Sequence, residues 1–398
     1  MKIARWIVVI TGLWLCMSCG ESQEQDDPFY TETALEERGP HTVGFQRTTV
    51  SYTPPGADTA RTLPVLVWYP GISTPDARRA DFTLLGTVPI RKARAFKNLA
   101  LDASKPRPLA VYSHGSGGEG VLAYPYAERL ASRGWVVAAV DHVGNTTKDT
   151  LGSDGVHEMA SSVYRPLDIS TVIDAAENGF ELEGFASEID TERTFLFGHS
   201  FGGFTAMLIG GAGYDLEKAQ ARACDQGADA APCTFLAQEA VQQAIARGFK
   251  DTRVQAIALQ APSMMGILKP EGVDVPTLLL TGDRDQTTTH QNASVPIWEG
   301  LDDPRDLWVR FADAGHFSFI TVCDIFGAGA IAAFEPSAPE DGCGPTFLPP
   351  SDVATLNAWY LSVFAEYYIQ GASAWAPFVR GEQQFRIQGD AEILFETH

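Results

Sequence analysis

Apolar residues in this chain gather in short runs that alternate with longer amphipathic stretches. Several of the short runs contain almost no polar residue, which is typical of parallel strands that are covered on both faces. The predicted strands span residues 44–52, 63–69, 108–113, 135–140, 193–197, 254–259, 277–281 and 307–311, and the predicted helices span 126–133, 166–178, 203–210, 238–247 and 354–369. This alternation predicts an α/β fold with a mostly parallel eight-stranded sheet and helices on both of its faces.

Three segments, 72–107, 211–250 and 326–350, interrupt the alternation. We expect them to be insertions over one edge of the sheet, where loops usually carry specificity. The pattern continues between them, so residues 41–398 are predicted to form one domain, although the length would also permit two or three.

The first forty residues are predicted to lie outside this domain. Two basic residues precede an apolar stretch at 6–15 that is too short to span a membrane, and Cys19 stands between two small residues. We therefore predict a secretory signal at residues 1–19 with a lipobox-like end, and Cys19 is the candidate for lipidation. An ordinary cleaved signal is the alternative.

Residues 20–40 hold seven acidic residues and one arginine, which predicts a solvated tether. The protein is expected to be exported, as a cell-envelope lipoprotein or in secreted form.

The net charge of the chain makes some classes of binding partner improbable. The 398 residues include 29 Lys or Arg against 50 Asp or Glu, a net charge of −21, which repels nucleic acids and anionic lipid surfaces. We expect membrane contact only through a lipid anchor.

Four cysteines follow the predicted signal: Cys224, Cys233, Cys323 and Cys343. An even number in an exported chain favours disulfides, and the local pairing of Cys224 with Cys233 and of Cys323 with Cys343 is the simplest of the three possible. Four buried free thiols are the alternative.

The strongest chemical signal is the sequence GHSFGG at 198–203. It follows an apolar strand and precedes a helix of small residues, which is the context that a G-x-S-x-G turn requires. Ser200 is therefore the candidate nucleophile, and the helix N-terminus beside it favours developing negative charge. A second loop, HGSGG at 114–118, follows the strand at 108–113. A loop of this kind supplies one backbone N–H of an oxyanion hole, and Phe201 supplies the other.

The same glycines permit a different interpretation. Residues 115–120 match G-x-G-x-x-G, and Asp141 stands 21 residues beyond Gly120, as in a dinucleotide-binding unit. That unit needs a helix that opens within the glycines, whereas Pro125 is expected to delay the helix to about Tyr126. It also leaves the serine turn unexplained.

The remaining partners of a serine nucleophile should follow later strands, the acid first and then the histidine. The strand at 277–281 leads into Asp283 and Asp285, and the strand at 307–311 leads into His316. We predict that His316 is the base and that Asp285 orients it. His114, His142 and His199 lie near other strand ends and are candidates for lining the pocket. No pattern indicates a metal, and no cofactor is expected.

The chain resembles the platelet-activating-factor acetylhydrolases and their dienelactone-hydrolase-like bacterial relatives, which have the α/β-hydrolase fold. The resemblance covers roughly 44–320 and rests on residues 111–115, 137–142 and 198–203. It implies that Ser200 is the nucleophile, that His316 is the base, and that the backbone amides of Ser116 and Phe201 form the oxyanion hole.

One position departs from the acetylhydrolases, which carry their acid after the strand that follows the nucleophile helix. Gln260 stands there in this chain. A neutral amide cannot stabilise an imidazolium, so the acid is expected in the loop at 282–285 instead.

The expected function is that of a secreted serine carboxylic-ester hydrolase that forms an acyl-enzyme on a short-acyl lipid or another small ester. A polyester (cutinase-like) hydrolase is the second possibility, and a nucleotide-dependent oxidoreductase or a non-catalytic binding protein on the same fold is a weaker one. An apolar acyl or aromatic group is expected from the residues near the site, namely Phe201, Phe317, Phe319, Met264 and Met265. A Cys323–Cys343 bridge is expected to steady His316.

Overall fold

The computed structural model describes residues 38–152, 155–387 and 391–398. The predicted signal, the lipidation candidate Cys19 and all but the end of the predicted tether lie outside these residues. Within them, no helix combines the length and the apolar character needed to cross a membrane.

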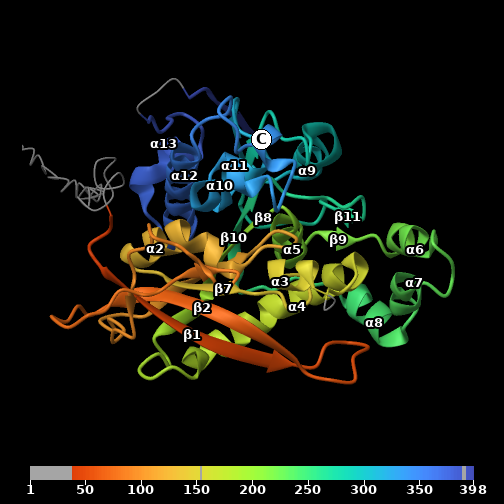
Figure 1. Cartoon of the computed structure of the whole chain (residues 1–398), viewed down its shortest axis with the longest axis horizontal. Coiled ribbons are helices and arrows are strands. Elements are labelled where there is room, and N and C mark those ends of the chain that lie inside the picture. Colours follow the sequence, from red (N-terminus) through yellow and green to blue (C-terminus); the bar gives the residue numbers. More distant parts are fainter. Residues whose placement is uncertain (1–37, 153–154, 388–390) are drawn as a thin grey trace, which may run out of the picture.

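A single large sheet organises the described chain (Figure 1). Its order is β14 (Ile393–Thr397), β13 (Leu307–Phe311), β12 (Thr277–Gly282), β10 (Val254–Gln260), β8 (Ile189–His199), β6 (Arg107–Ser113), β7 (Val136–Val140), β2 (Arg61–Gly71), β1 (Thr42–Tyr52) and β5 (Phe96–Lys97). The six central strands, from β13 to β7, are parallel to one another. Toward the edges, β14 is antiparallel to β13, β2 is antiparallel to β7, and β1 is antiparallel to β2.

All eight predicted strands are present, but the predicted strand count was too low because the sheet has ten strands. Each of the two additional strands lies at an edge. β5 has only two residues, which is too short to show a pattern, and β14 follows a long helical region and pairs with β13 along a partly exposed edge. Neither carries the continuous apolar run by which a central strand is identified.

Helices cover both faces of the sheet, as predicted. The α-helices of the described chain are α2 (Tyr124–Ser132), α3 (Thr147–Leu151), α4 (Glu158–Glu177), α5 (Phe201–Gly210), α6 (Leu216–Cys224), α7 (Ala231–Leu236), α8 (Glu239–Arg247), α9 (Val295–Gly300), α10 (Val322–Phe326), α11 (Ala328–Ile331), α12 (Pro350–Gln370) and α13 (Ala376–Val379). In β8, Phe195 and Phe197 pack in one core with α2 and α12, and Leu196 packs in the other with α4 and α5. This alternation along one strand is what a sheet between two helical layers requires.

Helix α4 begins eight residues before the predicted start at Pro166. The ring of proline does not end the helix there, and the true start is capped by the His157 side chain, whose Nδ1 accepts the backbone N–H of Ala160 at 3.0 Å. Histidine is not among the residues by which a cap is usually recognised.

The three insertions do not share one edge of the sheet, contrary to the sequence prediction. The first adds β5 beside β1. The second forms α6, α7 and α8, and Phe235 of α7 packs on Tyr164 of α4. The third contains α11 and lies near α10 and α12, on the other side of the molecule from α8 (Figure 1).

Two disulfides close local loops, Cys224–Cys233 and Cys323–Cys343. This is the local pairing that the sequence favoured. The second joins residues 20 apart in the sequence, and in the chain-entropy account such a bridge stabilises the fold by about 3 kcal/mol.

Candidate active site

Ser200 occupies a strained turn between β8 and α5. Its backbone has φ 54° and ψ −114°, a conformation that residues with a side chain rarely adopt. The glycines around it are required by close packing: a Cβ on Gly202 would lie 1.8 Å from the carbonyl oxygen of Ser113, and one on Gly198 would lie 2.4 Å from that of Gly202. The G-x-S-x-G sequence therefore reflects the contact between the ends of β6 and β8.

Strand register brings the other candidates to the same edge. Parallel pairing aligns β8 with β10, β10 with β12, and β12 with β13, so that their carboxyl ends lie side by side. His316 begins a short 3-10 turn after β13, and its Nδ1 donates to Oδ2 of Asp285 at 2.9 Å. Both side chains are buried. Open α/β sheets gather their sites at this edge.

The carboxylate of Asp285 is held in its ionised form. It accepts the backbone N–H groups of Thr287 (2.9 Å) and Thr288 (2.6 Å) and the hydroxyl of Thr288 (2.8 Å). Burial opposes ionisation, but the hydrogen bonds from His316 and Thr288 outweigh it and lower the pKa of Asp285 below its usual value. An ionised acid on Nδ1 leaves Nε2 of His316 available as the base.

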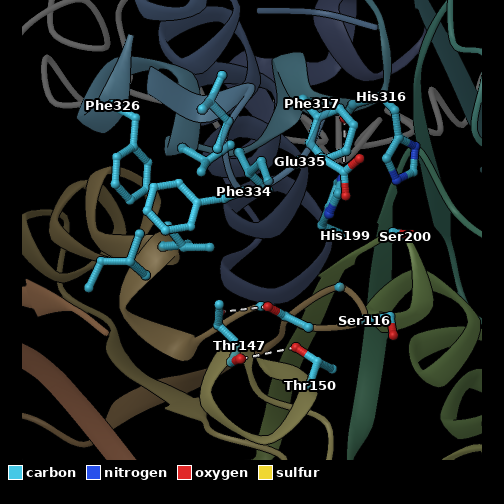
Figure 2. Close-up of a pocket in the computed structure, with 18 of the residues that line it drawn as sticks. Ser116, Thr147, Thr150, His199, Ser200, His316, Phe317, Phe326, Phe334 and Glu335 are labelled. Atoms are coloured by element: carbon cyan, nitrogen blue, oxygen red, sulfur yellow. Dashed lines mark hydrogen bonds between the residues drawn. The ribbon is translucent and has the colours of Figure 1, made fainter. Parts of the chain in front are cut away.

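Ser200 and His316 line the same cavity, and the imidazole of His316 points toward the serine (Figure 2). Ser200 Oγ makes no hydrogen bond to another described residue, and this contact typically tightens only when a substrate is bound. Beside them, His199 donates Nε2–H to the carbonyl oxygen of His316 at 3.1 Å. Burial and the adjacent His316 lower the pKa of His199 to about 3, so His199 remains a neutral donor that holds the His316 backbone.

Two residues considered in the sequence have other partners. Asp283 accepts two hydrogen bonds from Arg310, at 3.0 and 3.1 Å, rather than one from His316. Gln260 is fully buried, and its backbone carbonyl accepts the N–H of Ser200 at 2.8 Å. Gln260 thus supports the serine turn through its backbone, at the position where the acetylhydrolases place an acid.

The candidate oxyanion-hole amides are available to a ligand. The N–H of Ser116 has no acceptor among the described residues, and Ser116 lines the cavity with Ser200. Phe201 is the first residue of α5, where backbone N–H groups have no intrahelical partner. Its ring does not line the cavity but lies under the guanidinium of Arg165, whose Cζ is 4.6 Å from the ring centre.

A buried polar network supports the loop that carries Ser116. Asn145 Nδ2 donates to Ser116 Oγ at 3.2 Å, and Arg165 donates to Asn145 Oδ1 at 2.6 Å and to the carbonyl oxygen of His114. Arg165 is fully buried, so this charge-assisted network fixes the loop from beneath. Neither Asn145 nor Arg165 belongs to a motif, so their roles could not be predicted from the sequence.

A second Ser–His–Asp chain lies in the same buried region. Ser113 Oγ is 2.9 Å from His142 Nε2, and His142 Nδ1 is 2.8 Å from Asp168 Oδ2. All three side chains are fully buried, so they cannot reach a substrate. Of the three histidines expected to line the pocket, His199 does, whereas His114 and His142 lie beneath it.

The helix after the glycine loop begins at Tyr124, two residues earlier than Pro125 led us to expect. A 3-10 turn (Gly120–Ala123) leads directly into α2, and Pro125 is tolerated in the first turn of that helix. Asp141, the residue that would bind a ribose in a dinucleotide site, accepts the N–H of Gly120 at 2.6 Å. Its carboxylate therefore stabilises the glycine loop by a hydrogen bond inside the protein, which disfavours a dinucleotide site. Across the described residues, no three His, Cys, Asp or Glu side chains are grouped as a metal site would require.

Asp341 joins the two loops of the candidate triad, and sequence reasoning missed it. This buried side chain accepts the backbone N–H of His316 (2.9 Å) and of Gln286 (3.0 Å) on Oδ1, and the hydroxyl of Thr287 (2.8 Å) on Oδ2. Its own carbonyl accepts the N–H of Phe317 at 2.9 Å. One carboxylate therefore sets the position of the histidine loop relative to the acid loop. It lies in the third insertion and outside any motif.

The Cys323–Cys343 disulfide holds the segment that contains Asp341. Cys343 follows Asp341 by two residues, and both disulfide cysteines are buried. A Cβ on Gly315 would lie 2.5 Å from the carbonyl carbon of Asp341, so glycine is needed where the histidine loop meets this segment. The expected influence of the disulfide on His316 stays a prediction, with Asp341 as its physical route.

The cavity has a volume of about 430 Å³ and mostly apolar walls. Of the five apolar residues expected near the site, only Phe317 lines it. The wall comes instead from the first and third insertions and the neighbouring loops, through Leu84, Leu85, Leu122, Leu151, Ile320, Val322, Phe326, Ile331 and Phe334. Figure 2 shows Phe326 and Phe334 at one end of the cavity and Ser200 at the other.

Comparisons with known proteins agree with this architecture. Residues 104–228 match the family model described as serine aminopeptidase, S33. The chain is also similar in structure to a ferulic acid esterase from Streptomyces cinnamoneus, with 21% sequence identity and a TM-score of 0.60, over 84% of this chain and 92% of that one. The predicted α/β-hydrolase fold is confirmed. The matched family model and the fold indicate a hydrolase with the α/β-hydrolase fold.

Asp285→Asn is expected to lower ester turnover by about 10⁴-fold, because asparagine holds the wrong imidazole tautomer and cannot stabilise the imidazolium. Asp283→Asn is the matched control, since Asp283 binds Arg310, and we expect a change of less than about fivefold. Steady-state kinetics of both variants checks the ranking. A larger loss in Asp283→Asn would move the acid to Asp283.

Asp341→Ala is expected to lower kcat about 10- to 100-fold with little change in KM, because small displacements of the catalytic groups slow proton transfer. Asp341→Asn should recover much of the loss, since its amide oxygen can still accept the N–H groups of His316 and Gln286. Kinetics are measured below the melting temperature of each variant. If both variants lose activity equally, or if only KM changes, the positioning role is wrong.

Proposed function

We propose that the chain is a serine carboxylic-ester hydrolase that acts through an acyl-enzyme. The observation that carries the proposal is the Asp285–His316 hydrogen bond beside a serine on a strained turn, with Ser200 and His316 lining the same cavity. The family match to a serine hydrolase and the similarity to a protein named ferulic acid esterase support it.

In the proposed mechanism, Ser200 Oγ attacks the ester carbonyl carbon while Nε2 of His316 accepts the hydroxyl proton. Asp285 keeps Nδ1 protonated and stabilises the imidazolium. The N–H groups of Ser116 and Phe201 stabilise the oxyanion of the tetrahedral intermediate. When this intermediate collapses, His316 returns the proton to the leaving alcohol. Water, deprotonated by His316, then hydrolyses the acyl-Ser200 ester and releases the carboxylic acid.

The cavity supports a small ester with a short-acyl or aromatic group. Its volume of about 430 Å³ lies near the lower end of the range for small-molecule sites, and aromatic side chains line it at Phe317, Phe326 and Phe334. A short-acyl lipid, as hydrolysed by the acetylhydrolases that the sequence resembles, is one such substrate. The two disulfides are compatible with an extracellular protein, so we also infer export.

The mouth of the cavity favours a polyester as the second candidate substrate. Leu151 is 65% exposed and Phe334 is 52% exposed, and both belong to the cavity wall. Exposed apolar side chains at the rim of a site are suited to contact with an apolar surface.

A panel of nitrophenyl esters with acyl chains from two to about twelve carbons tests the proposal, with a benzoyl ester and an aminoacyl nitroanilide beside it. We expect the highest kcat/KM for short or aromatic acyl groups and a decline for long ones, because the cavity is small. Ser200→Ala should retain less than about 1% of the activity.

Two outcomes would contradict the proposal: hydrolysis that survives in Ser200→Ala, or a preference for the nitroanilide over every ester. Hydrolysis of polycaprolactone particles faster than of soluble esters would favour the polyester candidate.

A further inference from the structure

The third insertion, residues 326–350, places one carboxylate in the wall of the candidate active-site cavity. Glu335 lines this cavity together with Ser200 and His316. In the view of Figure 2, Glu335 lies between Phe334 at one end of the cavity and His316 at the other. The side chain is half-buried, so it keeps contact with solvent. A charged group in a mostly apolar wall is costly unless it has a partner.

The carboxylate of Glu335 is held on one side and open on the other. Its Oε1 accepts the hydroxyl of Ser337 at 2.6 Å and the backbone N–H of the same residue at 3.3 Å. Its Oε2 has no hydrogen-bond partner among the described residues, and no basic side chain of that part of the chain forms an ion pair with Glu335. The open oxygen is suited to a charged partner that comes from outside the protein.

Glu335 dominates the electrostatics of the cavity wall away from the Ser200–His316 pair. None of the described residues that line the cavity is Lys, Arg or Asp. His199 is neutral, because its pKa is lowered to about 3. The hydroxyls of Thr147 and Thr287 already donate to other protein groups. No cation of the described wall therefore offsets the negative charge of Glu335.

Two further features favour a positively charged ligand group. The rings of Phe317 and Phe334 line the same cavity, and the face of an aromatic ring attracts a cation. The whole chain has 29 basic against 50 acidic residues, and a net charge of −21 draws cationic molecules toward its surface. The local carboxylate and the overall charge thus act in the same direction.

We propose that Glu335 is a specificity-determining residue that selects esters carrying a cationic group, a quaternary or protonated amine, and disfavours anionic esters. The inference rests on the proposed ester hydrolysis, and Glu335 acts on substrate binding rather than on the reacting atoms. The ester carbonyl lies at Ser200, and the ammonium group lies against Oε2 of Glu335 with the aromatic rings beside it. A cavity of low polarity strengthens this attraction relative to water.

Pairs of esters that differ only in charge test the inference. In the first pair, the acyl chain of a nitrophenyl ester ends in a trimethylammonium group or in a tert-butyl group of nearly the same shape. In the second pair, the same two groups end the alcohol of an acetate ester. We expect kcat/KM of the cation to exceed that of its neutral isostere by about 10-fold in at least one pair, mainly through KM. The preference should shrink as ionic strength rises, because salt screens the charges.

Glu335→Gln removes the charge at nearly constant size, so the ratio of cationic to neutral kcat/KM should fall to near unity. Glu340→Gln is the matched control, because Glu340 is an exposed acid of the same insertion that does not line the cavity. It should retain the full ratio. A nitrophenyl ester whose acyl chain ends in a carboxylate should be a poorer substrate of the parent chain than the tert-butyl ester, and this difference should shrink in Glu335→Gln.

The inference is overturned if neither pair shows a preference for the cation, if Glu335→Gln keeps the preference, or if Glu340→Gln loses it to the same extent. These outcomes are distinct from a failure of the proposed function, which the neutral esters report by themselves. If Ser200→Ala hydrolyses the neutral esters as fast as the parent chain, the ester-hydrolase proposal fails and not only the role of Glu335.

Discussion

The close approach of the β6 end to the turn after β8 is the constraint on which the site depends. Backbone atoms of Ser113 and Gly202 are so near that no side chain fits between them, and this contact holds Ser200 in a conformation with positive φ. The strained turn places the serine at the carboxyl edge of the sheet and begins α5 directly behind it. Parallel register then brings the loops of Asp285 and His316 to the same edge. The candidate chemistry is thus a consequence of backbone packing.

The third insertion connects specificity with catalysis. It supplies Phe334 and Ile331 to the cavity wall and, from the same disulfide-closed loop, the Asp341 carboxylate that bridges the histidine and acid loops. A change in this loop would therefore alter the shape of the pocket and the position of His316 together. Burying a carboxylate is costly, and here three hydrogen-bond donors from the two loops compensate it.

The sequence predicted those parts of the fold that local patterns determine. The apolar strands, the serine turn and the two loops that carry Asp285 and His316 are each recognised from residues close together in the chain, and so is the local disulfide pairing. Asp341, Arg165 and Asn145 could not be found in this way, because their roles depend on contacts between segments far apart in sequence. The same holds for the cavity wall: Phe201 and Phe319 are near the serine or the histidine in sequence, yet they pack in the interior.

Labelling with a fluorophosphonate followed by peptide mapping tests the central claim most directly, since such a probe reacts with a serine only when the serine is activated. The account predicts one labelled site, at Ser200, and loss of labelling in the His316→Ala variant. Labelling of Ser116, which lines the same cavity, or no labelling of the folded protein would contradict it.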